Sequence, residues 1–328
     1  MIDVHTHILP SGLPVPGPAA RRAGWPVLRE SNGTRRVYQN DKLVRTLLPP
    51  GWDPGARLSD MDTDGVRVQV LSPIPFTFLY DAEPGIAAEL AAWQNDAIAK
   101  ICAELPERFA GLGTVALQDT ERAVAELHRV VNELGLAGVE IGTQMAGTGL
   151  HDPVLDPFFS AAERLGAALF VHPGKPLAPE RTAHNGLEFG LARPVETALA
   201  AGSLVHGGVL ARHPRLRVCL AHGGGATAML AGRWQRGWEL LDRPEGLADA
   251  SPRELLHRLW VDTLTYDPAA LSLAAVVFGD RHLLLGTDYP FTVAERPAGA
   301  VLSLHQRDLV AKNARAFLRT PALPRSTP

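Results

Sequence analysis

Short apolar segments alternate with longer segments of helical periodicity along most of this 328-residue chain. The apolar segments are rich in β-branched residues and indicate buried strands, whereas apolar residues three and four positions apart indicate amphipathic helices. Eight strands are expected, at residues 2–5, 66–72, 109–117, 136–142, 167–173, 216–224, 259–264 and 282–290. Strands that alternate with helices pair in parallel, and eight of them favour an α/β fold of the closed (β/α)₈, TIM-like barrel type over an open doubly wound sheet. We expect one domain over residues 1–320 and a tail over 321–328.

Residues 10–60 interrupt this alternation with a segment rich in Pro, Gly and Arg. Within it, TRRVYQNDKLVRTLL (34–48) contains two alternating runs around Asn40 and Asp41, a pair that suits the turn of a β-hairpin. We therefore expect a small insertion between the first strand and its helix. Because loops that follow barrel strands lie over the active-site end, this insertion should cover the mouth of the barrel.

Composition favours a small-molecule partner. The formal net charge is −3 and the isoelectric point is about 6.5, so the chain lacks the basic bias that holds nucleic acid or an anionic membrane. The two cysteines, Cys102 and Cys219, lie in apolar stretches and predict neither a disulfide framework nor a thiolate metal site. No apolar run approaches the roughly 20 residues of a membrane span, and the N-terminus lacks a signal-peptide pattern. We expect a cytoplasmic protein.

Histidines stand at the carboxyl ends of several predicted strands, where barrel enzymes place their chemistry. His5 and His7 share one face of the first strand, because residues i and i+2 of a strand point the same way. Three further residues end the fifth, sixth and eighth strands: His172, His222 and Asp288. Imidazole and carboxylate groups are ligands that Zn²⁺ prefers, and a catalytic site needs three or four of them. Any one of the five could be an ordinary buried polar residue, but together they predict a divalent metal centre.

These residues stand in the motifs IDVHTHILP, FVHPG, CLAHGGG and GTDYPF, and in this order the motifs resemble the amidohydrolase superfamily. Within it, the chain is most similar to the branch of metal-dependent decarboxylases typified by α-amino-β-carboxymuconate-ε-semialdehyde decarboxylase, over nearly its whole length. The resemblance implies a Zn²⁺ ion held by His5, His7, His172 and Asp288. It also implies that His222 is the catalytic base that activates the metal-bound water.

The resemblance further implies two arginines that bind a substrate carboxylate, Arg45 and Arg233. In the family the second arginine reaches the active site of the neighbouring subunit, so a homodimer is expected. A planar guanidinium suits this role because it holds a carboxylate through two parallel hydrogen bonds. By position alone, Arg45 could instead be a solvated hairpin residue and Arg233 part of an ion pair on a helix surface. Phe291, directly after GTDYP, is expected to pack beside the metal.

Several residues expected to line the substrate pocket depart from the family pattern. Gly174 stands where the semialdehyde decarboxylase has a bulky aromatic residue, and Phe189 stands where a tryptophan would lie over the substrate. Lys175 and Arg193 add two cationic candidates for substrate binding, although Lys175 could equally be solvent-exposed. These departures predict a change of substrate rather than a change of metal chemistry.

Three functions fit the sequence. The favoured one is a Zn-dependent non-oxidative decarboxylase of a small unsaturated or aromatic carboxylic acid that uses no organic cofactor. The alternative is a metal-dependent hydrolase or hydratase that acts on a lactone, an amide or a conjugated acid at the same site. The third, a barrel that kept its ligands without being an enzyme, is disfavoured by the complete set of five residues. The ligand types also suit Mn²⁺, Fe²⁺ or Co²⁺.

Overall fold

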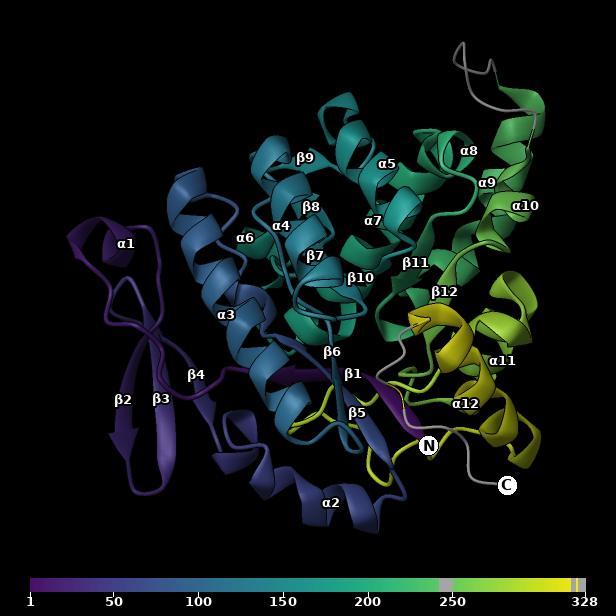
Figure 1. Cartoon of the computed structure of the whole chain (residues 1–328). Helices are drawn as coiled ribbons and strands as arrows, with labels where there is room; N and C mark the ends of the chain where they lie inside the picture. Colours follow the sequence, from purple (N-terminus) through teal and green to yellow (C-terminus); the bar gives the residue numbers. More distant parts are fainter. Residues whose placement is uncertain (242–249, 320–322, 324–328) are drawn as a thin grey trace.

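Eight parallel strands form the centre of the computed structural model, which describes residues 1–241, 250–319 and 323 (Figure 1). One sheet has the order β1 (Ile2–Ile8), β5 (Val68–Pro73) and β6 (Phe109–Gly111). The other has the order β13 (Leu283–Leu284), β12 (Trp260–Asp262), β11 (Arg217–Leu220), β10 (Ala168–His172) and β7 (Gly138–Gly142). Every pairing within these two sheets is parallel, which confirms the prediction of an α/β fold.

The two sheets meet at both edges through single bridges. Thr6 of β1 bridges Tyr289 at one edge, and Gly113 bridges Val139 of β7 at the other. The strand ladder is therefore interrupted twice over the described residues, and the structure has two parallel sheets in place of one continuous ladder. Most strands are also shorter than predicted, because the residues at their carboxyl ends leave the ladder to form the loops that carry the polar side chains.

Helices follow most of the strands and cover their outer side (Figure 1). The longer ones are α3 (Pro84–Glu104), α4 (Thr120–Asn132), α5 (Asp156–Leu165), α7 (Arg193–His206), α9 (Thr227–Leu240), α11 (Pro268–Phe278) and α12 (Leu304–Leu318). The shorter ones are α1 (Pro18–Arg22), α2 (Leu58–Thr63), α6 (Pro179–Thr182), α8 (Val209–Arg212) and α10 (Pro252–Leu256). Within the described part of the chain, no helix combines the length and apolarity that a bilayer span requires.

Helix boundaries follow local chemistry. Asp119 accepts a hydrogen bond from the backbone N–H of Arg122 and so caps the start of α4. Gly166 ends α5 with a left-handed backbone at φ 61°, a conformation that glycine adopts without a steric penalty. Along α4, Ala123, Leu127 and Val130 are buried at helical spacing, so this helix packs its apolar face on the strands.

A three-stranded antiparallel sheet lies between β1 and β5 in the chain. It consists of β2 (Val27–Ser31), β3 (Thr34–Gln39) and β4 (Lys42–Leu47). Figure 1 shows it at one end of the molecule, in purple. The turn between β3 and β4 is Asn40-Asp41, with φ values of 49° and 60°, as a two-residue hairpin turn requires. Buried Val37 of β3 packs in one apolar cluster with Leu9 and Ile74, so the small sheet is anchored beside the strand ends.

Successive side chains along the strands point to opposite faces, and the apolar ones form two separate core clusters. One cluster lies between the strands and the helices, and the other contains strand residues of the opposite face, among them Val4, Val70 and Phe170. Cys219 belongs to the second cluster, and both it and Cys102 are free cysteines. The division into residues 1–320 and a tail stays a prediction, since positions 320–322 and 324–328 lie outside the described residues. The packed strands form a rigid base for the loops at their carboxyl ends.

Candidate metal centre

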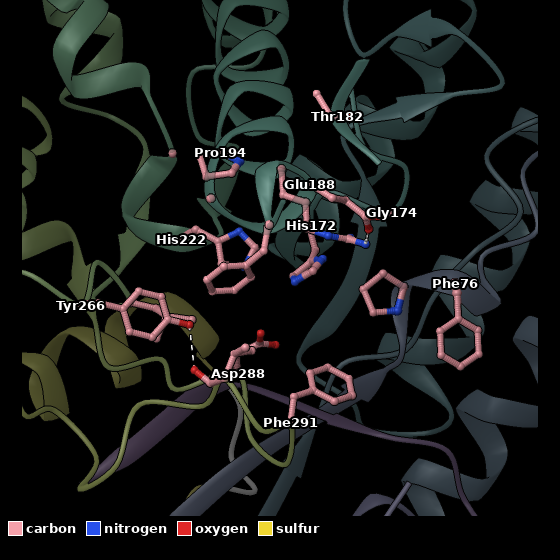
Figure 2. A pocket seen from close by; sticks show the side chains of 18 of the residues that line it. Phe76, His172, Gly174, Thr182, Glu188, Pro194, His222, Tyr266, Asp288 and Phe291 are labelled. Carbon is pink, nitrogen blue, oxygen red and sulfur yellow. Dashed lines mark hydrogen bonds and ion pairs between the residues drawn. The ribbon is translucent and has the colours of Figure 1, made fainter. Parts of the chain in front are cut away.

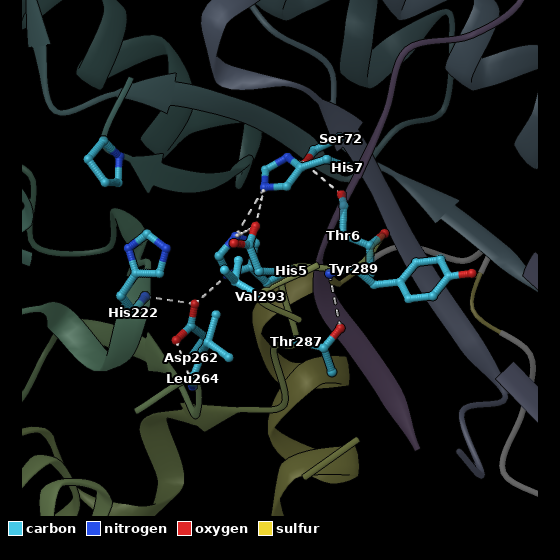
Figure 3. Close-up of polar contacts among 12 residues, drawn as sticks. His5, Thr6, His7, Ser72, His222, Asp262, Leu264, Thr287, Tyr289 and Val293 are labelled. Carbon is cyan, nitrogen blue, oxygen red and sulfur yellow. Dashed lines mark hydrogen bonds and ion pairs between the residues drawn. The ribbon is translucent and has the colours of Figure 1, made fainter. Parts of the chain in front are cut away.

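Four of the predicted residues meet at the carboxyl ends of the strands. His5 and His7 belong to β1, His172 is the last residue of β10, and Asp288 follows β13. One potential ligand atom from each of the four lies within 4.8 Å of the other three, and all four residues are buried. Figure 2 shows His172 and Asp288 facing the same open space, and Figure 3 shows His5 and His7 beside it. The geometry suits a single metal ion.

The outer ring nitrogens of His5 and His7 fix how both rings are oriented. His5 Nδ1 lies 2.7 Å from Asp262 Oδ2, and His7 Nδ1 lies 3.0 Å from the carbonyl oxygen of Pro73. Each partner is an acceptor, so each Nδ1 carries a proton and leaves the Nε2 lone pair directed inward. The two Nε2 atoms are 3.1 Å apart, and Asp288 Oδ1 lies 3.4 and 3.2 Å from them. Three electron-rich atoms this close together fit a cation between them.

His172 supports the same interpretation. Both of its ring nitrogens are buried and have no hydrogen-bond partner among the residues the structure describes. Burial, with the nearby charges of His222 and His7, holds the pKa of His172 well below its usual range, so its ring is neutral. A buried imidazole with unused nitrogens is costly unless a metal ion or another group satisfies it. The donor set of three imidazoles and one carboxylate therefore fits a divalent metal.

Carboxylates make this region favourable for positive charge. Burial disfavours the charged form of His5, but the hydrogen bonds with Asp262 and Asp288 outweigh burial and raise the pKa of His5 to about 10. Burial also works against ionised Asp288, yet its contacts with His5 and His7 hold the pKa of Asp288 well below its usual value. A proton and a metal ion therefore compete for the same electronegative pocket.

His222 lies next to this cluster but outside the set of four. Its ring centroid is 4.9 Å from that of His172 and 5.4 Å from that of His5. Burial, followed by the charge of His5, lowers the pKa of His222 to about 4, so the ring is neutral at pH 7 and can accept a proton. Its backbone has φ 59°, an uncommon conformation for a residue with a side chain and one that recurs at functional sites.

Asp262 is a site residue that the sequence analysis missed. It is the last residue of β12 and fully buried, and its two oxygens accept four hydrogen bonds. One comes from the His5 ring, at 2.7 Å, and three come from the backbone N–H groups of His222, Gly223 and Leu264, at 2.8–3.0 Å. Figure 3 shows Asp262 between His5 and His222. In the sequence, the only indication of this role was that Asp262 stands near the end of the predicted strand that contains WVDTL.

Glu140 is a second residue that was missed. It lies on β7, is fully buried, and places Oε2 3.8 Å from His7 Nδ1. Burial raises the pKa of Glu140 well above its usual range. The signal in the sequence was a single acidic residue within the apolar strand GVEIG.

A cavity of about 680 Å³ opens above the cluster and contains most of the expected substrate-binding residues. Its lining includes His172, His222 and Asp288 together with Arg45, Phe189, Arg193 and Phe291. Phe291 stacks on His7 with ring centroids 5.3 Å apart, and the guanidinium carbon of Arg45 lies 4.5 Å from the Phe291 ring centroid. Arg45 Nε is buried and unpaired within the described part of the chain, while burial and nearby Arg193 lower the pKa of Arg45. Arg45 therefore forms no ion pair within 4.0 Å among the residues that the structure describes, and its nearest ring contact is Phe291.

Arg193 and Phe189 belong to the wall that faces Tyr266. Arg193 donates hydrogen bonds to the carbonyl of Pro173 and, at 2.5 Å, to Oε1 of Glu188. The Phe189 ring lies 6.0 Å from that of Tyr266, so the two aromatic rings stand together at the opening. Arg193 is positioned to contribute charge to the cavity, although Glu188 already neutralises part of it.

Two expected substrate-binding residues lie elsewhere. Lys175 forms an ion pair with Asp81, is 59% exposed, and lines a neighbouring cavity instead of the metal cavity, in keeping with the solvent-exposed alternative; its role in substrate binding stays untested. The chain turns away after Gly174, which directs the lysine toward the loop that follows β5. Arg233 is exposed on α9 and is not among the described residues around the metal cavity of its own chain. The expectation that Arg233 reaches the neighbouring subunit's site stays a prediction.

With this geometry established, similarity to known proteins identifies the family. A family model described as amidohydrolase matches residues 2–320. The chain belongs to the amidohydrolase family. It is 39% identical over 305 residues to a 2-amino-3-carboxymuconate-6-semialdehyde decarboxylase of Dictyostelium discoideum, covering 92% of this chain and 84% of that protein. The predicted resemblance to the metal-dependent decarboxylase branch, and the prediction of an enzyme of the carbon–carbon lyase type, are confirmed.

Solved structures agree with this family. The 5-carboxyvanillate decarboxylase of Sphingomonas paucimobilis superposes with a TM-score of 0.80 at 26% identity, over 97% of this chain and 98% of that one. A 5-carboxyvanillate decarboxylase of Novosphingobium aromaticivorans, crystallised with manganese and 4-hydroxy-3-methoxy-5-nitrobenzoic acid, gives 0.71 at 25% identity over 83% and 82%. In that relative, a divalent metal and a small aromatic acid are present in one crystal structure.

Proposed function

We propose that this chain is a Zn-dependent non-oxidative decarboxylase of a small unsaturated or aromatic carboxylic acid. One observation supports this above all: the cavity lined by His172 and Asp288 of the three-histidine, one-aspartate cluster is also lined by Arg45, whose Nε has no hydrogen-bond partner among the described residues. We also infer that the two parallel sheets together form the closed (β/α)₈ barrel of the family. The identity of the metal rests on the resemblance, since the same ligands suit Mn²⁺, Fe²⁺ and Co²⁺.

In this proposal the residues of the chain divide the chemistry between them. Arg45 binds the substrate carboxylate, and Phe291 packs beside it. When bound, a divalent cation supplies a Lewis acid that makes hydroxide available near neutral pH. His222, neutral at pH 7, takes a proton from water and passes it to the carbon that bears the carboxylate. The bond to the carboxylate then breaks, CO₂ leaves, and the bonding pair restores the conjugated system. The hydroxide left by the water takes up a proton from solvent, so the net reaction consumes one proton for each CO₂ released.

The proposal includes a homodimer in which Arg233 serves the neighbouring site. Arg233 is exposed on α9, and Leu199 of α7 and Met229 of α9 expose apolar surface on adjoining helices. Exposed apolar side chains on packed helices are typical of surfaces that associate. A cytoplasmic location belongs to the same proposal and rests on the free thiols of Cys102 and Cys219.

Release of CO₂ tests the reaction. Acids labelled with ¹³C at the carboxylate, namely 5-carboxyvanillate, 2,6-dihydroxybenzoate and 2-amino-3-carboxymuconate semialdehyde, are incubated with the Zn²⁺-loaded protein. We expect labelled CO₂ from at least one class of acid, and its loss in His222→Ala. The matched control is His128→Ala, an exposed histidine on α4 that should retain turnover.

The same assay separates the alternative. A hydrolase or hydratase at this site would add water to a lactone, an amide or a double bond, so ¹⁸O from labelled water would enter the product without release of CO₂. Incorporation of ¹⁸O with no CO₂ from any acid would replace the decarboxylase proposal by that alternative.

A further inference from the structure

A second cavity adjoins the metal cavity and has a volume of about 320 Å³. The two cavities share Pro75, Phe76 and Gly174 in their linings. Gly174 follows the ligand residue His172 by two positions, and Pro75 and Phe76 lie in the loop after β5. In Figure 2, Gly174 and Phe76 lie on the side of the metal cavity away from Tyr266. The second cavity, here called the side cavity, therefore lies beside the metal cavity, with these three residues at the boundary between them.

Gly174 lies at the junction between the two cavities. A Cβ atom at this position would lie 3.6 Å from the carbonyl oxygen of Pro75 and 3.7 Å from Cδ2 of Phe78, in ordinary van der Waals contact with both. Its backbone is outside the left-handed region, so no turn requires glycine here. What glycine contributes at this point is space, because any longer side chain would fill the junction.

The side cavity has an interior of aromatic, aliphatic and uncharged polar residues, the polar ones being Gln39, Asn40, Thr143 and Gln144. The rings of Phe78 and Tyr80 stack with centroids 5.4 Å apart, and Leu79 and Ala146 add aliphatic surface. Tyr80 is partly buried, and its hydroxyl accepts a hydrogen bond from the backbone N–H of Gly142 at 3.3 Å. Such a lining favours a flat or aliphatic group over a charged one.

Charge occurs only at the rim among the described residues of the lining. There the ion pair of Lys175 and Asp81 is more than half exposed to solvent. The volume is near the lower limit of the roughly 300–1,000 Å³ that small-molecule sites have. It therefore suits one substituent of a larger ligand better than an independent ligand.

We propose that the side cavity is a substrate subsite, and that Gly174 determines whether a substituent of the acid can reach it. The inference rests on the proposed function, since the carboxylate end of the same acid is held near Arg45 and the metal ligands. The substrate class that follows is an unsaturated or aromatic acid with an apolar arm, of three carbons to one ring in size, on the side remote from its carboxylate.

Binding of matched acids tests the subsite without requiring turnover. The probes are 2,6-dihydroxybenzoate and its 4-propyl and 4-phenyl derivatives, titrated into the Zn²⁺-loaded protein by calorimetry. Each buried methylene tightens binding about four-fold, so the propyl arm should gain about 50-fold over the parent acid. In Gly174→Leu the affinity ratio of the propyl acid to the parent acid should fall to about one, whatever the change in parent affinity, and Gly174→Ala should keep most of the ratio.

Two further variants control the interpretation. Ala82→Phe fills the side cavity from a wall that the metal cavity does not share, so it should remove the gain even if Gly174→Leu fails to fold. Gly190→Leu adds a side chain beside the metal cavity only, so it should weaken the binding of the propyl, phenyl and unsubstituted acids by the same factor. The subsite is overturned if the propyl or phenyl group does not tighten binding to the wild type. It is also overturned if Gly174→Leu and Ala82→Phe weaken the substituted acids and 2,6-dihydroxybenzoate by the same factor. If the substituted acids bind more tightly as expected but no acid releases CO₂, the proposed decarboxylase function is rejected and the subsite is kept.

Discussion

Replacement of Asp262 by Asn should weaken metal binding although Asp262 is not one of the four clustered residues. Oδ2 of Asp262 faces two N–H donors, from the His5 ring and the backbone of His222, and Oδ1 faces two more, from Gly223 and Leu264. An amide has one oxygen and one NH₂ group, so in either orientation the NH₂ group meets two donors. If it faces His5, the ring must accept at Nδ1 and carry its proton on Nε2, the atom that points to the metal.

The size of this effect follows from the groups involved. Loss of a carboxylate that orients a metal-binding histidine typically lowers metal affinity 10- to 100-fold, which corresponds to about 1.4–2.7 kcal/mol. A buried N–H left without its acceptor costs about 1–3 kcal/mol of unfolding free energy. We therefore expect Asp262→Asn to lose 10- to 100-fold in Zn²⁺ affinity and about 1–3 kcal/mol in the stability of the metal-free protein.

Competition with a chromophoric chelator measures the affinity, and denaturation of the metal-free protein measures the stability. The matched control is Asp267→Ala, which removes the side-chain cap of α11 and should cost about 1 kcal/mol of stability with unchanged Zn²⁺ affinity. Wild-type affinity in Asp262→Asn, or an equal loss in both variants, would refute the argument that Asp262 sets the tautomer of His5.

Four other predictions test the site and the fold. His5→Ala should lose metal and activity together, as measured by metal analysis; a variant with full metal content would remove His5 from the ligand set. His222→Ala should keep its metal and lose roughly 10²–10⁴-fold in turnover, and a metal-free variant would make His222 a ligand. Arg45→Ala and Arg233→Ala should each be poorly active, by about 2–5 kcal/mol of carboxylate binding, but random exchange into mixed dimers should restore about a quarter of wild-type activity. Without restoration after confirmed exchange, the shared site is rejected. Burial raises the pKa of Glu295 to about 7, so the folded state holds a proton that the unfolded state releases near pH 4.5. The contribution of Glu295 to stability should therefore fall by up to about 3 kcal/mol as pH rises from 4.5 to 7, and Glu295→Gln should make the slope of stability against pH shallower by that amount in urea denaturation; an unchanged slope would contradict the assignment.

The strand-end histidines could be predicted because their evidence is local. In FVHPG and CLAHGGG, an apolar run ends at a histidine, and parallel strands bring such ends to one edge whatever lies between them. His172 and His222 therefore come together although 50 residues separate them. The same argument predicts the side of the molecule on which the cavity opens.

Lys175 and Asp262 show where local evidence fails. Lys175 lies three residues after a metal ligand, yet its side chain turns to Asp81 in a different loop, and no sequence pattern specifies that pairing. Asp262 stands at the end of a predicted strand like the histidines, but a lone aspartate there is also a common turn residue. Only the packing of β12 between β11 and β13 brings its oxygens to His5 and to the backbone of His222.

The two failures have different consequences for function. Asp262 connects a metal ligand and the backbone of the proposed base through one buried carboxylate, so a change there affects the metal and the proton transfer together. Gly174 and Lys175 are not among the four clustered residues, and neither forms a hydrogen bond or ion pair with them among the contacts of the described residues. A substitution at either position therefore removes no donor atom from the cluster, and this is why we place the proposed substrate difference at Gly174 and not at the clustered residues.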